Sequence, residues 1–108
     1  MRSEDLLLEE LREELLRVLS KHLDLSKYRV FFFGSRVQGR AGRGSDVDVG
    51  IEGPPIDPFK WTQIEEEIEN LPTLYRIDLV DFNKTSEEFK REALKHIEVI
   101  YEPEKDIH

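Results

Sequence analysis

The chain has 108 residues, 38% of them apolar and 37% charged, with a formal net charge of −8, which predicts one folded domain spanning residues 1–108. Cysteine is absent and no apolar run approaches the roughly 20 residues of a membrane helix, which excludes disulfides, thiolate chemistry and a membrane span, so a cytoplasmic protein is expected. Because contacts to nucleic-acid phosphates need a basic surface, the negative charge also argues against direct nucleic-acid binding.

The first half of the chain predicts a helix, a strand and a glycine-rich connection. Residues 28–33 are aromatic and β-branched and end at Gly34, which is typical of a buried strand. Residues 35–45 contain three glycines and form a connection that starts with a helical turn. Before the strand, residues 4–23 form an amphipathic helix, and one stripe of that helix carries Leu8, Leu11, Leu15, Leu19 and Leu23.

Residues 46–51 alternate acidic and aliphatic side chains and predict a strand with one polar and one buried face. A second helix follows. Asp57 is the expected N-cap and Pro58 the first helical residue, and Pro72 closes the element.

The last third of the chain predicts a third strand over residues 75–82 and then a helix. Thr85 and Glu88 fit a capping box that begins this helix, which runs to about residue 97. Residues 99–101 either extend the core or add a short edge strand. The order α-β-α-β-α-β-α predicts an α+β fold, a small mixed sheet of three or four strands with helices packed on one face.

Strand periodicity places three carboxylates on one face of this sheet. Asp46 and Asp48 point the same way, about 7 Å apart by strand rise. If the aliphatic residues of 75–82 face the helices, Asp78 emerges beside them, whereas Asp81 has the parity of the buried residues and is a strand-end acid. A solvated strand end is the structural alternative for the first pair. Carboxylates gathered in this way raise each other's pKa unless a cation lies between them.

Oxygen ligands without cysteine suit Mg²⁺ or Mn²⁺ rather than zinc. The three histidines show no ligand spacing. The sequence therefore predicts a site for a hard divalent cation.

Gly34 and Ser35 predict a phosphate-binding turn. Glycine lets a phosphate approach the backbone, the hydroxyl donates to it, and the N–H groups of a following helical turn attract anions. Two other glycine-rich phosphate loops are excluded. The sequence has no Gly-Lys-Ser/Thr, which a P-loop requires, and the glycines of residues 35–45 are spaced in the reverse order of a dinucleotide-binding loop. No acidic residue occurs between Asp24 and Asp46. This acid-free window creates a positive island around the turn, or it is a chance feature of a solvated loop. The basic residues within it are Lys27, Arg29, Arg36, Arg40 and Arg43.

Residues 33–39 (FGSRVQG) followed by residues 44–49 (GSDVDV) resemble the minimal nucleotidyltransferases of the DNA polymerase β superfamily. That family has Gly-Ser, about ten residues, Asp-x-Asp and a third Asp on a later strand. The resemblance covers about residues 30–51 and 75–82, and it implies a palm-like fold. Gln38 departs from the pattern, because the family often has arginine there.

The resemblance also implies roles for individual residues. Gly34 and Ser35 would hold the β- and γ-phosphates of a nucleotide, and Asp46 and Asp48 would bind two metal ions. Asp78 would bind the catalytic ion and help activate an acceptor hydroxyl. The candidates for further phosphate contacts are Arg36, Arg40 and Arg43.

The small size predicts that the acceptor is another protein or is held by one. Chains of this kind are similar to MntA-type antitoxins, which pair with HEPN-domain ribonuclease toxins. This resemblance implies transfer of AMP from ATP to a toxin tyrosine. One alternative is a non-catalytic antitoxin that acts by complex formation. Another is a metal-dependent nuclease, which leaves Gly34 and Ser35 unexplained.

Overall fold

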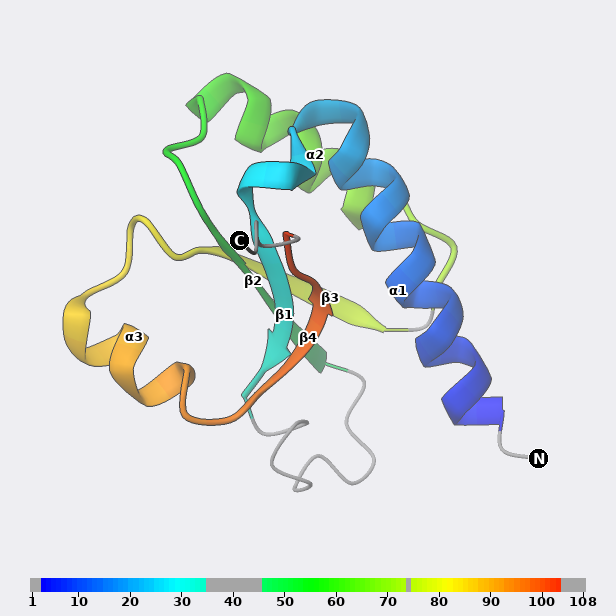
Figure 1. Cartoon of the computed structure of the whole chain (residues 1–108). Helices are drawn as coiled ribbons and strands as arrows, with labels where there is room; N and C mark the ends of the chain where they lie inside the picture. The colour runs from blue at the N-terminus through cyan, green and yellow to red at the C-terminus, as the bar shows by residue number, and fades with distance from the viewer. Residues whose placement is uncertain (1–2, 35–45, 74, 104–108) are drawn as a thin grey trace, which may run out of the picture.

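The computed structural model describes residues 3–34, 46–73 and 75–103, with side chains from Leu8 onward. These residues form a mixed sheet of four strands and three α-helices (Figure 1). In chain order the elements are α1 (Ser3–His22), the short 3₁₀ helix η1 (Leu25–Lys27), β1 (Arg29–Phe33), β2 (Asp46–Glu52), α2 (Pro58–Glu69), β3 (Arg76–Asp81), α3 (Glu87–Ala93) and β4 (Ile97–Tyr101). None of the described helices is both long and apolar enough to cross a bilayer.

The strands lie side by side in the order β3-β2-β1-β4. β1 is antiparallel to β2 and to β4, whereas β2 and β3 are parallel. The parallel pair is connected through α2, as parallel neighbours need a crossover. The predicted α+β class with a small mixed sheet is confirmed. Of the two alternatives for residues 99–101, the structure shows the edge strand, which is part of β4.

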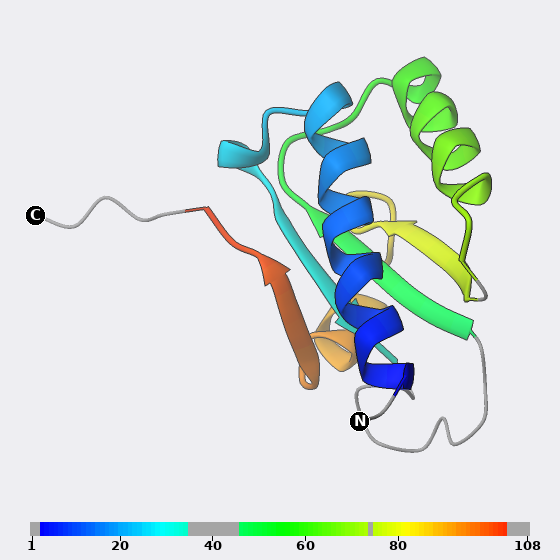
Figure 2. The same cartoon turned by 90° about the vertical axis from the view of Figure 1, so that its right-hand side faces the viewer.

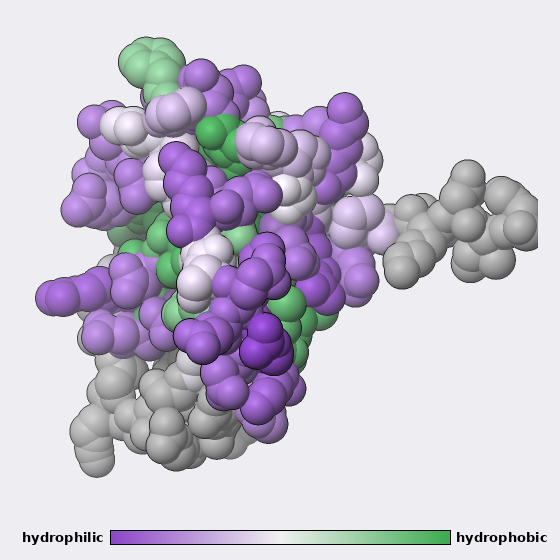
Figure 3. Space-filling model, turned by 90° about the vertical axis from the view of Figure 1, so that its left-hand side faces the viewer, coloured by the Kyte–Doolittle hydropathy of each residue, from purple (hydrophilic) through white to green (hydrophobic). Residues whose placement is uncertain are grey.

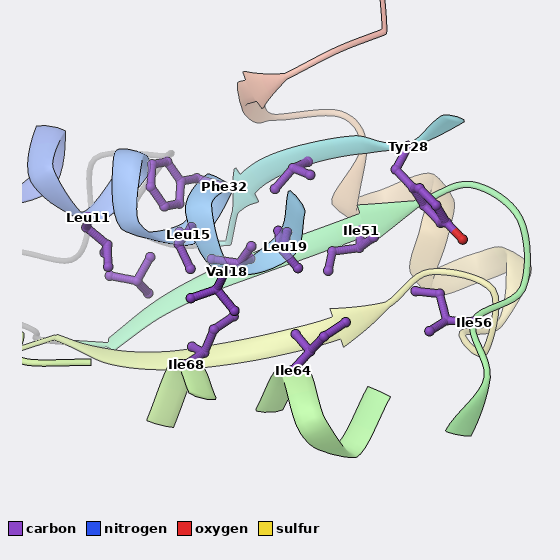
Figure 4. Packing of buried hydrophobic residues seen from close by; sticks show 13 residues of the cluster. Leu11, Leu15, Val18, Leu19, Tyr28, Phe32, Ile51, Ile56, Ile64 and Ile68 are labelled. Atoms are coloured by element: carbon purple, nitrogen blue, oxygen red, sulfur yellow. The ribbon is translucent and has the colours of Figure 1, made fainter. Parts of the chain in front are cut away.

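The larger core lies between the sheet and the pair α1 and α2, which cover one face (Figure 2). The leucine stripe of α1 is buried as predicted, since Leu11, Leu15 and Leu19 are at most 2% exposed. Full burial of one such side chain contributes about 1.5–3 kcal/mol. Figure 4 shows how this layer is filled from α1, α2 and the strands, with Val18, Phe32, Ile51, Ile64 and Ile68 among its members.

A second, aromatic core lies on the opposite face. Phe31, Phe33 and Phe82 are buried there and meet edge to face, with ring centroids 5.0–6.1 Å apart. Gly50 leaves room for them, because a Cβ at this position would lie 2.5 Å from a Phe31 ring carbon. α3 packs on this face through Phe89, whose ring centroid is 6.0 Å from that of Phe33.

The prediction that helices pack on one face therefore holds for α1 and α2, whereas α3 lies on the other face. The reason is the composition of β1. Its side chains are large and apolar on both faces, so each face needs a cover. The outer surface on the α3 side is mainly hydrophilic, with separate small apolar areas (Figure 3).

The predicted start of α2 is confirmed. The Asp57 side chain accepts a hydrogen bond from the Lys60 backbone N–H, and Pro58 opens the helix.

The predicted start of α3 is wrong by one residue. Ser86, not Thr85, is the N-cap, and its Oγ accepts from the Phe89 N–H at 3.0 Å. Thr85 instead donates its hydroxyl to the Phe82 carbonyl. The helix also ends earlier than predicted, because the β-branched run that starts at Ile97 pairs with β1.

Candidate functional site

The three predicted carboxylates lie on one face of two neighbouring strands. Asp46 and Asp48 belong to β2 and Asp78 to β3, and Asp48 is directly opposite Asp78 in the parallel register. Ile77 and Leu79 pack against the α1–α2 side, as the parity argument requires. The structure thus brings together residues that are 30 positions apart in the chain.

Asp48 is the most enclosed of the three. Burial raises the pKa of its carboxyl group above the usual value, and the charges of Asp78 and then Asp46 raise it further. Neighbouring carboxylates with this effect form a site whose ionised state is stabilised by a cation.

The donor set fits a hard divalent cation. Carboxylate oxygens suit Mg²⁺, which proteins commonly hold with one or two carboxylates together with the phosphates of a substrate. Among the described residues, no three histidine, cysteine, aspartate or glutamate side chains form a ready-made metal cage. The pair Asp48 and Asp78 would supply the carboxylates for a shared site, and Asp46 lies two residues before Asp48 on the same face of β2.

Gly34 follows β1 directly and lies against Asp48. Its φ is +90°, and a Cβ at this position would overlap the Asp48 carboxylate oxygen Oδ2. Glycine is therefore required here for conformation and for space. The residue predicted to let phosphate approach the backbone is in contact with a predicted metal ligand.

Ser35, Arg36, Arg40 and Arg43 lie outside the described residues, as does the predicted helical turn.

The prediction that Lys27 and Arg29 join a positive island around Gly34 is wrong. Both lie at the other end of β1, and each strand residue adds about 3.3 Å. Arg29 also forms an ion pair with Glu52 at 2.7 Å and covers the Phe31 ring. Closeness in the sequence did not give closeness in space, because the strand is extended.

Two further residues border the site. The Nε atom of Arg76 is 3.9 Å from Oδ1 of Asp46, in an exposed and therefore weak ion pair. Phe33 is opposite Asp48 on the β1 side and is 6% exposed, so it places apolar surface beside that carboxyl. The alternation along β3 that puts Asp78 on the carboxylate face also puts Arg76 there. The registers of β2 with β3 and of β1 with β2, which bring Arg76 and Phe33 to the site, could not be predicted from the sequence.

Residues 13–106 match the family described as polymerase beta nucleotidyltransferase. The chain is 37% identical over 81 residues to the probable protein adenylyltransferase MntA of Haemophilus influenzae, covering 74% of this chain and 71% of that protein.

Two solved structures have the same fold. A toxin–antitoxin with AMP-PNP superposes with a TM-score of 0.66 at 18% identity, over 83% of this chain and 72% of that one. An MNT antitoxin in complex with the tri-AMPylated HEPN toxin of Shewanella oneidensis superposes with a TM-score of 0.65 at 14% identity. The match covers 86% of this chain and 71% of that one.

Proposed function

The chain belongs to the polymerase β nucleotidyltransferase family, and on that basis we propose that it transfers AMP from ATP to a hydroxyl acceptor. The observation that carries the proposal is the direct pairing of Asp48 with Asp78, with Gly34 against the same carboxyl. A residue predicted to bind phosphate and residues predicted to bind a cation therefore lie together, which supports chemistry on a nucleoside triphosphate.

In the proposed reaction the acceptor oxygen attacks the α-phosphorus of ATP in line. The bond between the α-phosphorus and the oxygen that bridges to the β-phosphate breaks, and pyrophosphate leaves with the electron pair. Asp78 orients the acceptor hydroxyl and takes its proton. Positioning and charge stabilisation are the main contributions of a protein to such a transfer.

Asp46, Asp48 and Asp78 would hold two Mg²⁺ ions, with Mn²⁺ as a substitute, and these ions supply positive charge against the charge that develops on the phosphates. Gly34 and Ser35 bind the β- and γ-phosphates through the backbone and the hydroxyl. Further phosphate contacts are assigned to Arg36, Arg40 and Arg43.

We further propose that the acceptor is a tyrosine of a HEPN-type toxin and that the transfer silences the toxin. Support comes from the relative named as a protein adenylyltransferase and from the neighbour in which an MNT antitoxin is bound to an AMPylated toxin. The net charge of −8 complements a basic, RNA-handling partner.

The test combines the chain, ATP labelled in the α-phosphate, Mg²⁺ and a HEPN-domain partner. Label should appear on the partner and should be lost with Asp48→Asn and Asp78→Asn, whereas the exposed Glu66→Gln serves as a control. Full transfer by both aspartate variants would overturn the catalytic assignment. Tight complex formation without any label would support the alternative, an antitoxin that acts by binding alone.

A further inference from the structure

We propose that the outer edge of β3 binds the acceptor polypeptide as an added strand. The occupant is an extended, basic segment of a partner protein that carries the hydroxyl side chain to be modified. The role of the edge in delivering an acceptor rests on the proposed function, whereas docking at the edge does not.

β3 is an outer strand of the described sheet, with β2 on one side (Figure 2). The Phe82 N–H donates to the Ile51 carbonyl of β2 at 2.9 Å. Because successive strand residues direct their backbone polar groups to alternate sides, Ile77 and Leu79 direct theirs outward. Their N–H and C=O groups are positioned to pair with another chain, as in strand addition.

Among the described residues, the part of this edge for which no backbone partner is seen is short and ends beside the site. The outward carbonyl of Asp81 already accepts from the Lys84 N–H at 2.9 Å, which closes the far end. Residues 77–79 remain, and they centre on Asp78. They include neither lysine nor proline, the residues that commonly protect an edge strand from pairing. An added strand would therefore pass directly alongside the predicted catalytic carboxylate.

A trough runs along the same edge, between β3 and α2. One depression of about 280 Å³ is lined by Glu65, Ile68, Glu69, Ile77, Asp78 and Leu79. A second, of about 500 Å³, shares four of these residues and extends to Thr73 and Tyr75. The two depressions therefore adjoin along one edge, and both reach Asp78, whose carboxyl lies on the opposite face of β3. Side chains of an added strand would enter the trough on the α2 side.

The charge of the trough selects the occupant. Glu65 and Glu69 are exposed and one helical turn apart on α2, and within the described part of the chain neither forms an ion pair. Glu65 and Glu69 give the trough two carboxylates, and Asp78 adds a third negative charge to the same edge from the opposite face of β3, which favours lysine or arginine in the docked segment. The opposite outer strand, β4, is separated from Asp78 by β1 and β2 and offers no such route.

The test measures the binding of three fluorescein-labelled peptides of equal length, each with one central tyrosine, by fluorescence anisotropy. The first has lysines around the tyrosine and the second has glutamates. The third is the lysine peptide with N-methyl groups on alternate backbone nitrogens, which removes the hydrogen bonds of strand pairing. The proteins are the full chain, the double variant Glu65→Lys with Glu69→Lys, and the charge-matched control Glu9→Lys with Glu66→Lys, which lies outside the trough.

We expect the lysine peptide to bind at least tenfold tighter than the glutamate and N-methylated peptides. The trough variant should weaken its binding at least fivefold, and the charge-matched control should leave it unchanged. Equal binding of the N-methylated peptide, an equal loss in both double variants, or no binding of the lysine peptide would overturn the proposal. Self-association that competes with the peptide and is lost in the trough variant would instead assign the edge to a second copy of this chain.

Labelled ATP and Mg²⁺, added to the lysine peptide, separate this inference from the proposed function. Edge-dependent peptide binding without transfer of label, to the peptide or to a HEPN-domain partner, would remove the proposed function and leave the docking edge. Transfer that is insensitive to N-methylation and to the trough variant would keep the function and overturn the edge.

Discussion

Gly34 lies so close to Asp48 that a Cβ on residue 34 would overlap the Asp48 oxygen Oδ2. The turn after β1 therefore packs directly against the Asp48 carboxylate of β2, and a larger side chain at residue 34 would displace that carboxylate.

Gly34→Ala should lower the free energy of unfolding by about 1–3 kcal/mol, because φ is +90° and the new methyl group meets Asp48. Urea unfolding measures this cost. Combining it with Asp48→Ala removes the overlap but not the backbone strain, so the double variant should lose less than the sum of the two single losses. Strict additivity would show that the two residues are not in contact.

Asp48→Asn should stabilise the metal-free protein at neutral pH. Burial and the neighbouring carboxylates raise the folded-state pKa of Asp48, so its ionised form costs stability above that pKa. The cost disappears as the pH falls below the unfolded value, where both states are protonated. Urea unfolding in the presence of a chelator, from pH 7 to pH 3, should show the two proteins converging at low pH. A constant difference across this range would count against the raised pKa.

Glu67→Gln should have the opposite pH dependence. The Glu67 carboxylate accepts hydrogen bonds from Lys21 and His22, which join α2 to the end of α1. The Lys21 and then the His22 hydrogen bond lower its pKa below the usual 4.5. The stabilisation that the Glu67 carboxylate provides is therefore fully present above its pKa in the unfolded chain. It is lost as the pH falls through its lowered pKa in the folded protein. In thermal unfolding, the wild type should have a higher melting temperature than the variant at pH 7, and the difference in melting temperature should disappear at low pH. Glu66→Gln, on the same helix, is the control.

Phe82→Ala should cost about 3–5 kcal/mol, because Phe82 is 1% exposed and contacts the rings of Phe31 and Phe33. Phe89→Ala should cost clearly less, since its side chain is 41% exposed. Guanidinium unfolding of the two variants compares them directly. Equal losses would mean that α3 is held as firmly as the sheet beneath it.

The strand period was sufficient to place Asp46, Asp48 and Asp78 on one face, because alternation along a strand is a local property. It could not give the pairing of Asp48 with Asp78, since register depends on how strands meet across the crossover through α2. The position of α3 was missed for a related reason. Val30 and Phe32 face one side of β1 and Phe31 and Phe33 the other, but an unbroken apolar run does not tell which helix covers which side.

Other differences arose where two local signals compete. Thr85 and Ser86 are both good N-caps, and the choice between them was made by the Phe82 carbonyl, which engages the Thr85 hydroxyl. Lys27 and Arg29 share an acid-free window with the turn, but an extended strand carries them away from it.

The parallel pairing of β2 and β3 has a consequence for how the protein acquires its activity. The two strands are joined through α2, so β2 can pair with β3 only once the crossover and β3 have both been synthesised. During synthesis, the carboxylate pair is absent until residues beyond Asp78 have left the ribosome, and contacts between such distant segments form late and slowly. A chain truncated before β3 retains Gly34, Asp46 and Asp48 but lacks Asp78. The three carboxylates are therefore assembled only when β3 pairs with β2.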